Sequence, residues 1–343
     1  MAEAQEYVER AATRIRAVLD EHGAVVHPEL LARIAEGYYE SSGENIDPHH
    51  VTEALRDLRR GGHLTWVTGP TRGGHRLQTI QPTDRTRRAT KIDTAAARKR
   101  ALLARYTGWS QGTKRHPQGL VGPAGEAATR RAILDSNALQ PATQGAGETT
   151  RLLGTTLPGP ADSAGYLVPL NRGIPTAPVT LIFEVKNIRS WIYPRSEELY
   201  QVLHKASVLR AAQPGQLIIP ILVCRKAHIT SFWMAKQLGF IVIDTGRQWA
   251  GDVHERELLE VRNELHFHDL HAGSEPSARV RDRLRDTLPR IAISVADEWA
   301  RTCAIPGVPD TIDALRRAHD NERETLMSHL RELFQDQGYR GGW

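Results

Sequence analysis

The sequence predicts an α/β protein in which a mixed β-sheet is flanked by helices, with a small helical domain before this core and a helical region after it. Three patterns support this prediction. Residues 179–187 form an apolar, β-branched run that is typical of a buried strand. Strand and helix patterns alternate from there to residue 244, and the N-terminal part carries three amphipathic helical stripes followed by two β-type runs.

The length of the chain and these changes of pattern predict four parts. At 343 residues the chain is longer than one typical domain. We place an N-terminal domain at 1–83, a basic helical connector at 84–120, the α/β core at 121–272 and a helical region for packing or dimerisation at 273–343.

The composition restricts the class of protein only loosely. Lys and Arg outnumber Asp and Glu by 45 to 40, and the resulting charge of +5 weakly favours a polyanionic partner. No run approaches the roughly 18 apolar residues of a membrane span, and the first residues lack the pattern of a secretory signal. Because Cys224 and Cys303 are the only cysteines, we expect a cytoplasmic protein without a disulfide or membrane association.

The N-terminal domain is predicted to contain three helices and a β-hairpin. Two amphipathic helices are expected near residues 8–19 and 30–38. A third helix is capped by Asp47, followed by a proline that fits the first turn, and it ends at Gly61. Two short β-type runs with a turn-rich segment between them follow within residues 64–80.

Three helices followed by a hairpin resemble a winged helix-turn-helix domain. The resemblance implies that the third helix enters the major groove of DNA and that the hairpin lies along the backbone. A small protein–protein module is the alternative. The residues expected to face DNA are His49, His50, Thr52, Glu53, Arg56, Arg59 and Arg60 on the third helix, and Arg72, His75 and Arg76 on the hairpin.

The connector is strongly basic. Residues 85–115 contain ten Lys or Arg and a single acid, Asp93, around an alanine- and leucine-rich stretch that predicts a helix. Like charges repel unless something neutralises them, and the phosphates of a nucleic acid would do so. We therefore expect the connector to contact nucleic acid, while a solvated helix face is the alternative. The central cations of the connector are Arg98, Lys99 and Arg100.

An acid and a base stand at the end of the apolar strand at 179–187. Side chains alternate along a strand, so Glu184 and Lys186 point to the same face while Val185 points into the core. An antiparallel pairing with the preceding β-type run would set Asp162 beside both. A structural ion pair at the strand end is one interpretation, and metal-dependent cleavage of phosphodiesters is the other.

Helices are predicted before and after this strand in the sequence. Glu126 lies in the first turn of a leading helix, and a later helix capped at Ser196 carries Gln201. Strands at 217–223 and 240–243 are joined by a further helix, which implies a parallel crossover.

A helix with Glu, an Asp at a strand start, Glu-x-Lys on the next strand and a helix with Gln resemble the PD-(D/E)xK nuclease superfamily, which includes restriction endonucleases and Holliday-junction resolvases. The resemblance covers residues 122–244 and implies a restriction-endonuclease-like fold. It assigns metal-binding acids to Asp162 and Glu184, the catalytic lysine to Lys186, an accessory acid to Glu126 and the helix glutamine to Gln201.

The resemblance also implies a metal-dependent mechanism. Asp162 and Glu184, with the carbonyl of Val185, would hold Mg²⁺ (Mn²⁺ being a substitute) through hard oxygen ligands. The metal would activate a water, and Lys186 would orient this water and stabilise the transition state. Since cutting both strands of a duplex normally takes two active sites, a homodimer is plausible.

A second group of candidate ligands lies further along the chain. His266, His268, Asp269 and His271 could ligate zinc, although such runs are commonly solvated and no further ligand follows at a suitable spacing.

Three functions remain open from the sequence. The first is a DNA endonuclease of restriction or phage-defence type, reading a sequence or a modification of double-stranded DNA through the winged helix. The second is a structure-specific repair or recombination nuclease. The third is a non-catalytic DNA-binding regulator, against which the joint presence of Asp162, Glu184 and Lys186 argues.

Overall fold

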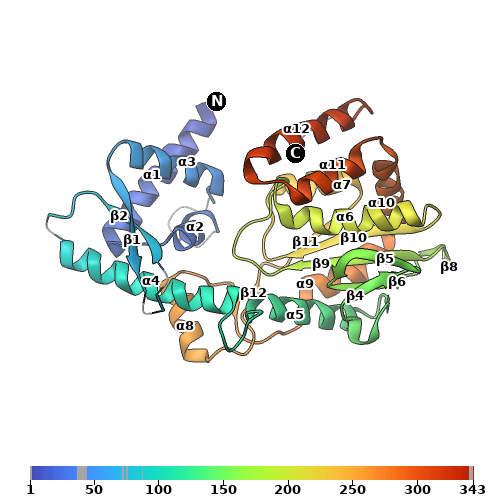
Figure 1. Cartoon of the computed structure of the whole chain (residues 1–343), viewed down its shortest axis with the longest axis horizontal. Helices are drawn as coiled ribbons and strands as arrows, with labels where there is room; N and C mark the ends of the chain where they lie inside the picture. The colour runs from blue at the N-terminus through green and yellow to red at the C-terminus, as the bar shows by residue number, and fades with distance from the viewer. Residues whose placement is uncertain (1, 37–44, 72, 75, 87, 340–342) are drawn as a thin grey trace. The chain divides into compact units, whose positions relative to one another are not determined.

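The computed structural model describes residues 2–36, 45–71, 73–74, 76–86, 88–339 and 343, and it divides into two units (Figure 1). Unit 1 comprises Met1–Leu120 together with Asp252–Ala272, and unit 2 comprises Val121–Gly251 together with Gly273–Trp343. The division differs from the predicted one in two respects. The connector belongs to the N-terminal unit, which also takes a segment predicted to lie in the core, and the C-terminal helices belong to the unit of the core.

Unit 1 begins with three helices and an antiparallel hairpin, in the predicted order. Asp47 caps the third helix as predicted, because its side chain accepts a hydrogen bond from the N–H of His49 (3.1 Å). Residues 37–44 and the predicted hairpin contacts Arg72 and His75 lie outside the described residues. The elements are α1 (Ala2–His22), α2 (His27–Ala35), α3 (Pro48–Arg60), β1 (Leu64–Pro70) and β2 (Arg76–Pro82).

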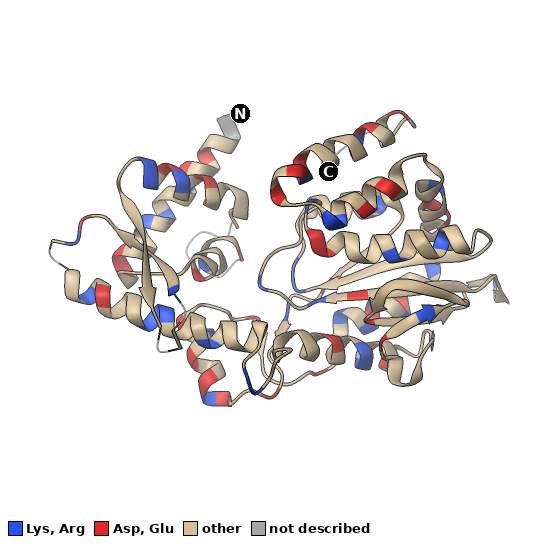
Figure 2. Ribbon diagram, in the orientation of Figure 1, with Lys and Arg blue, Asp and Glu red and all other residues tan. Residues whose placement is uncertain are grey.

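The basic connector forms helix α4 (Ala89–Gln111), which packs against α8 (Glu255–Glu264) within unit 1. Arg105 Nη1 lies 2.8 Å from Glu260 Oε2, and Arg98 lies 3.9 Å and 3.8 Å from Glu260 and Glu264. In Figure 2 the ribbon of α8 is red at its acidic residues, and the ribbon of α4 is blue at its basic residues. The carboxylates of α8 therefore neutralise part of the positive charge on α4 that the sequence analysis expected phosphates to neutralise.

Two of the cations expected to face DNA are packed inside unit 1. Lys99 is 5% exposed, and its Nζ lies 2.8 Å from Oε1 of the fully buried Glu29. The guanidinium of Arg100 lies against Gly69 of β1, where an added Cβ would come within 2.6 Å of Cζ. Lys99 offers no exposed charge to a phosphate, so the expected contact of Lys99 with DNA is withdrawn.

Unit 2 is an α/β unit around a mixed five-stranded sheet of order β11-β10-β9-β6-β3. The three strands β9, β10 and β11 run parallel, joined by helices α6 and α7 as predicted. Strand β6 pairs antiparallel with β9, and β3 pairs antiparallel with β6. The strands are β3 (Gln140–Pro141), β6 (Ser163–Leu167), β9 (Val179–Lys186), β10 (Leu217–Cys224) and β11 (Ile241–Asp244).

Helices cover both faces of this sheet (Figure 1). On β9, Ile182 packs with Leu203 of α6 on one face, whereas Phe183 packs with Ile133 of α5 and Ala292 of α10 on the other. This alternation places β9 at the centre of the core on both faces. The helices are α5 (Val121–Ser136), α6 (Glu197–Ala212), α7 (Ile229–Leu238) and α10 (Leu288–Ala304).

The C-terminal region is helical as predicted, and its apolar residues Leu315, Leu330 and Phe334 join the core of unit 2. Pro289 lies in the first turn of α10, directly after a π-helical segment. Among the described residues no helix combines the length and apolar character needed to cross a membrane. The elements are α9 (Ala278–Asp282), the π segment (Arg283–Thr287), α11 (Val308–Arg317) and α12 (Asp320–Gln335).

Short elements complete the chain. They are η1 (Gln144–Ala146), the hairpins β4 (Thr149–Leu152) with β5 (Thr155–Ala161) and β7 (Leu170–Asn171) with β8 (Ile174–Pro175), and the two-residue strands β12 (Gln248–Trp249) and β13 (Leu270–His271).

Candidate active site

Asp162 lies at the junction of β5 and β6, directly beside the end of β9. Its N–H donates to the carbonyl of Phe183 (3.1 Å), and its Oδ2 accepts a hydrogen bond from the N–H of Val185 (2.6 Å). Strand β6 pairs antiparallel with β9, with Ser163 opposite Phe183. The predicted antiparallel pairing is confirmed, and it holds the Asp162 carboxylate against the backbone between Glu184 and Lys186.

Glu184 and Lys186 point to the same face of β9, as strand alternation predicts. Lys186 Nζ lies 2.9 Å from Glu184 Oε1 and donates to Gln201 Oε1 at 2.7 Å. Val185 packs against the buried cluster on the opposite face of the sheet. Gln201, predicted from its place on the following helix, therefore contacts the lysine that the sequence singled out.

Lys205 is a site residue that the sequence did not predict. It lies one turn after Gln201 on α6, and its Nζ reaches Glu184 Oε2 (2.5 Å) and the carbonyl of Pro160 (2.5 Å). Glu184 is 4% exposed and has a lysine on each carboxylate oxygen. The two ammonium groups offset the cost of burying this charge. The spacing of four residues between Gln201 and Lys205 was the feature of the sequence that could have indicated that both face the site.

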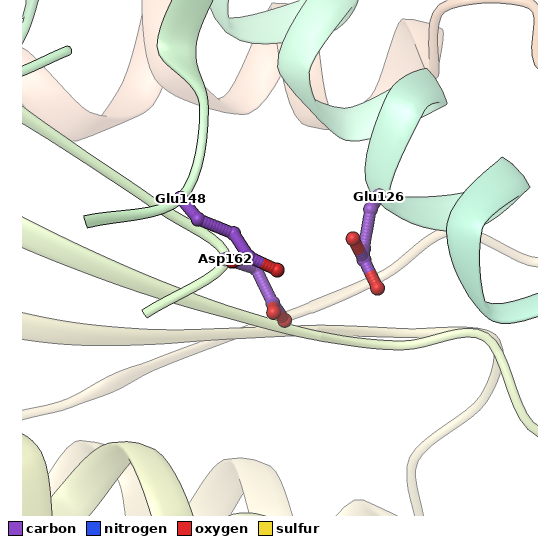
Figure 3. A group of neighbouring side chains, drawn as sticks. All are labelled: Glu126, Glu148 and Asp162. Carbon is purple, nitrogen blue, oxygen red and sulfur yellow. The ribbon is translucent and has the colours of Figure 1, made fainter. Parts of the chain in front are cut away.

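Asp162 is also one of three carboxylates that lie close together. One oxygen from each of Glu126, Glu148 and Asp162 lies within 4.8 Å of the others (Figure 3). Arg130 joins them, because it donates to Glu126 Oε2 (2.9 Å) and to the Asp162 carbonyl (3.2 Å). The sequence missed Glu148, although it is the only acid between residues 137 and 161.

The oxygens of these three carboxylates suit a hard divalent cation. This set differs from the predicted ligands because it does not include Glu184. Carboxylate oxygens are the ligands that Mg²⁺ and Mn²⁺ prefer, and the crowding of three of them is a cost that a cation would relieve. Asp162, which the sequence predicts to be a metal ligand, belongs to this group. The oxygens of Glu184 accept instead from Lys186 and Lys205. The Val185 carbonyl stays a predicted ligand.

Asp162 titrates near neutral pH. Burial, and then the negative charge of Glu184, raise the pKa of Asp162 from 3.8 to about 7, although the hydrogen bond from Val185 opposes the shift. Because the folded protein binds this proton more tightly than the unfolded chain, Asp162 contributes stability at acid pH. This contribution is lost as the pH rises through the window from 3.8 to about 7.

Replacing Asp162 with asparagine is expected to stabilise the metal-free protein at pH 8 relative to the wild type. The amide oxygen can still accept from Val185 N–H, while the charge that opposes folding is gone. We expect the stability difference between variant and wild type to be larger at pH 8 than at pH 5 by at least ~1 kcal/mol. Urea unfolding with EDTA at both pH values measures it.

The exposed Asp135 on α5 provides the matched control. Asp135→Asn should change the free energy of unfolding equally at the two pH values. A pH-independent effect of Asp162→Asn would contradict the assigned titration.

The residues predicted to face DNA separate into exposed and packed groups. On α3, Thr52, Arg56, Arg59 and Arg60 are exposed, as are Arg76 on β2 and Arg98 on α4. His50 instead stacks on Tyr7 of α1, with ring centres 5.5 Å apart. His49, itself exposed, contacts the carboxylate of Asp47 at 2.7 Å.

The histidine-rich segment brings two rings together. His266 Nδ1 and His268 Nε2 are 3.2 Å apart. Within the described part of the chain, the cluster of Glu126, Glu148 and Asp162 is the one set of three or more acidic, histidine or cysteine side chains close enough to share an ion. The candidate zinc ligands of this segment are therefore not brought together as one site.

Comparison with known proteins gave no match to a family model, to a curated protein or to a solved structure. The function therefore has to be argued from the side chains of the site.

Proposed function

We propose that this chain is a metal-dependent nuclease that hydrolyses phosphodiester bonds in DNA. The observation that carries the proposal is the joint placement of Asp162, Glu184 and Lys186 at the end of a buried strand pair, with Gln201 on the lysine. Glu126 stands across from Asp162. These are the residues on which the resemblance to PD-(D/E)xK nucleases rests.

The acidic side of the site would hold Mg²⁺ through Asp162, with Glu126 and Glu148 as partners. When bound, the ion supplies Lewis-acid polarisation of the phosphate and lowers the pKa of a water. Asp162 is the ligand whose position is best fixed, because Val185 N–H and the backbone of Phe183 both hold it.

Lys186 would supply the positive charge on the other side of the scissile phosphate. Its side chain is 19% exposed, compared with 11% for Lys205. Glu184 and Gln201 fix its ammonium group, which would neutralise charge that develops in the transition state and orient the attacking water. Glu184, with Lys205 behind it, acts in this scheme as a positioning residue.

Unit 1 is proposed to bind double-stranded DNA in the manner of a winged helix. The supporting observations are the three helices followed by a hairpin and the exposure of Arg56, Arg59, Arg60 and Arg76. A nuclease with a separate DNA-reading unit suits restriction or phage defence, with recognition that depends on a base sequence or a base modification.

The proposal is tested by cleavage with the wild-type chain. The protein is incubated with Mg²⁺, with Mn²⁺ or with EDTA on unmodified, methylated and branched DNA, and the product ends are sequenced. We expect cleavage that EDTA abolishes. Ends at a fixed sequence or modification support a restriction enzyme, whereas cutting at junctions alone supports a structure-specific nuclease. Binding without cleavage on every substrate would overturn the proposal in favour of a regulator.

A further inference from the structure

One surface of unit 2 carries aromatic and basic side chains that the proposed active site does not use. It lies just past the carboxyl ends of β9 and β10, where residues 188–196 run beside residues 225–228. The N–H of Ile192 donates to the carbonyl of Lys226 (3.0 Å), and the N–H of His228 donates to the carbonyl of Ile192 (2.9 Å). The two segments therefore pair like short parallel strands.

Strand alternation turns the large side chains of this pairing outward. The two central residues, Ile192 and Ala227, form the bridge and are buried in the core of unit 2. Their neighbours on either side face away from that core in two pairs. The pairs are Trp191 with Lys226, whose Nζ lies 4.6 Å from the ring centre, and Tyr193 with His228, whose rings stack 5.0 Å apart at 22°.

Helix α7 extends this surface. It begins directly after His228, and its residues Ile229 and Trp233 are 52% and 50% exposed. Residues four apart lie on the same face of a helix, so these two apolar side chains are neighbours. We call the whole surface the aromatic edge. It consists of Trp191, Tyr193, Lys226, His228, Ile229 and Trp233.

The two segments that build the aromatic edge carry charge of one sign up to the acids that follow them, Glu197, Glu198 and Asp244. Residues 187–196 and 225–243 contain five Lys or Arg and no Asp or Glu. One of the five, Arg225, is buried and donates to the carbonyls of Ile188 and Arg189, so it holds the segment in place. Arg195 and Lys236 are exposed. Aromatic side chains among cations without acids suit a strand of nucleotides rather than an acidic or a purely apolar partner.

We propose that the aromatic edge binds unpaired nucleotides, with bases stacking on Trp233 and on the neighbouring rings. Bases inside a duplex stack on one another and offer no free face, so the ligand is a single strand or a locally unpaired segment. The backbone of the edge adjoins the strand end that carries Lys186, because the N–H of Arg225 donates to the carbonyl of Lys186 (3.3 Å). Resting on the proposed function, this assigns unpaired DNA beside the scissile phosphodiester as the substrate.

The test measures binding without cleavage. In EDTA, fluorescence anisotropy compares a labelled 20-nucleotide deoxythymidine strand with a duplex of equal length, for the full-length wild type and for Trp233→Ala. Loss of one stacked base is expected to weaken single-strand binding about 5- to 100-fold, with duplex binding changed less than about 2-fold. Ile174→Ala removes an apolar side chain that is more exposed than Trp233 (69%) from the β7–β8 hairpin, and it should alter neither affinity.

Two results would overturn the proposal. Trp233→Ala could leave single-strand binding unchanged, or it could weaken binding to strand and duplex by the same factor. The first result together with a changed sedimentation coefficient would identify the edge as a contact between copies of the chain. Trp191→Ala is the second variant, in case Trp233→Ala fails to fold.

Cleavage assays on the same two DNAs with Mg²⁺ separate this inference from the proposed function. Strand binding that depends on Trp233 without any cleavage would remove the nuclease assignment and keep the aromatic edge as a binding site. Cleavage of duplex alone, with no effect of Trp233→Ala, would keep the nuclease and remove the aromatic edge.

Discussion

Replacing Lys186 with methionine is expected to reduce Mg²⁺-dependent cleavage by about 10²- to 10³-fold, the usual cost of losing one group that stabilises transition-state charge. The methionine keeps the apolar stem of the side chain and removes the ammonium that Glu184 and Gln201 hold. Glu184 retains Lys205 on its second oxygen, so the fold should survive with a stability change of about 1 kcal/mol or less. Initial cleavage rates and urea unfolding measure the two effects.

Lys205→Met is the matched control, because both lysines contact the same carboxylate. Lys205 is buried and also donates to the carbonyl of Pro160. Its removal leaves Oε2 of the buried Glu184 and the carbonyl of Pro160 without this donor, although Lys186 stays on Oε1, and an unsatisfied buried acceptor of this kind costs roughly 1–3 kcal/mol of stability. Lys186→Met should therefore mainly lower the cleavage rate, whereas Lys205→Met should mainly lower the stability. Wild-type cleavage rates for Lys186→Met, with DNA affinity unchanged, would rule out the proposed role of this lysine.

The sequence predicted the strand pair at the centre of the site because the relevant rules are local. The alternation of Glu184, Val185 and Lys186 follows from strand geometry, and the short connection at 168–178 between β6 and β9 favours antiparallel pairing. Gln201 needed only one further element, the helix that crosses from β9 to β10. Each of these predictions depended on the order of neighbouring elements.

The contacts that the sequence could not predict depend on which face of each helix or loop packs against the sheet or against another helix. Lys205 was visible one turn from Gln201, but helical spacing does not say which carboxylate it reaches. Glu148 lies in an irregular segment with no periodicity to place it. Arg105 and Glu260 are 155 residues apart, so the neutralisation of the connector by α8 required the tertiary fold. The charge count of the connector was correct, whereas its interpretation as a DNA tether ignored acids distant in sequence.

Gly125→Ala is expected to destabilise the protein and to impair cleavage, although alanine normally favours a helix interior. Gly125 lies on α5, next to Glu126, and a Cβ added here would come within 2.4 Å of the Asn187 Cβ. Asn187 directly follows Lys186 and is 4% exposed. Its side chain donates to the carbonyls of Val121 (2.6 Å) and Trp249 (2.7 Å), so it ties the end of β9 to α5.

The overlap cannot be relieved by a flexible side-chain tip, because the nearest atom is a Cβ. Either α5 moves away from β9 or Asn187 loses its hydrogen bonds, and overpacking of this kind costs about 1–3 kcal/mol. A shift of α5 also carries Glu126 away from Asp162, which should lower the affinity of the site for Mn²⁺. Thermal unfolding and a Mn²⁺ titration followed by electron paramagnetic resonance measure the two consequences.

Gly122→Ala, on the same helix, is the control. A Cβ at Gly122 meets nothing within 4 Å, so the alanine should leave metal binding unchanged and stabilise the helix by up to ~1 kcal/mol. If both variants were equally stable, the close approach of α5 to Asn187 would not constrain the site. If Gly125→Ala lost stability but bound Mn²⁺ normally, the overlap would be relieved at Asn187, and α5 with Glu126 would keep its position.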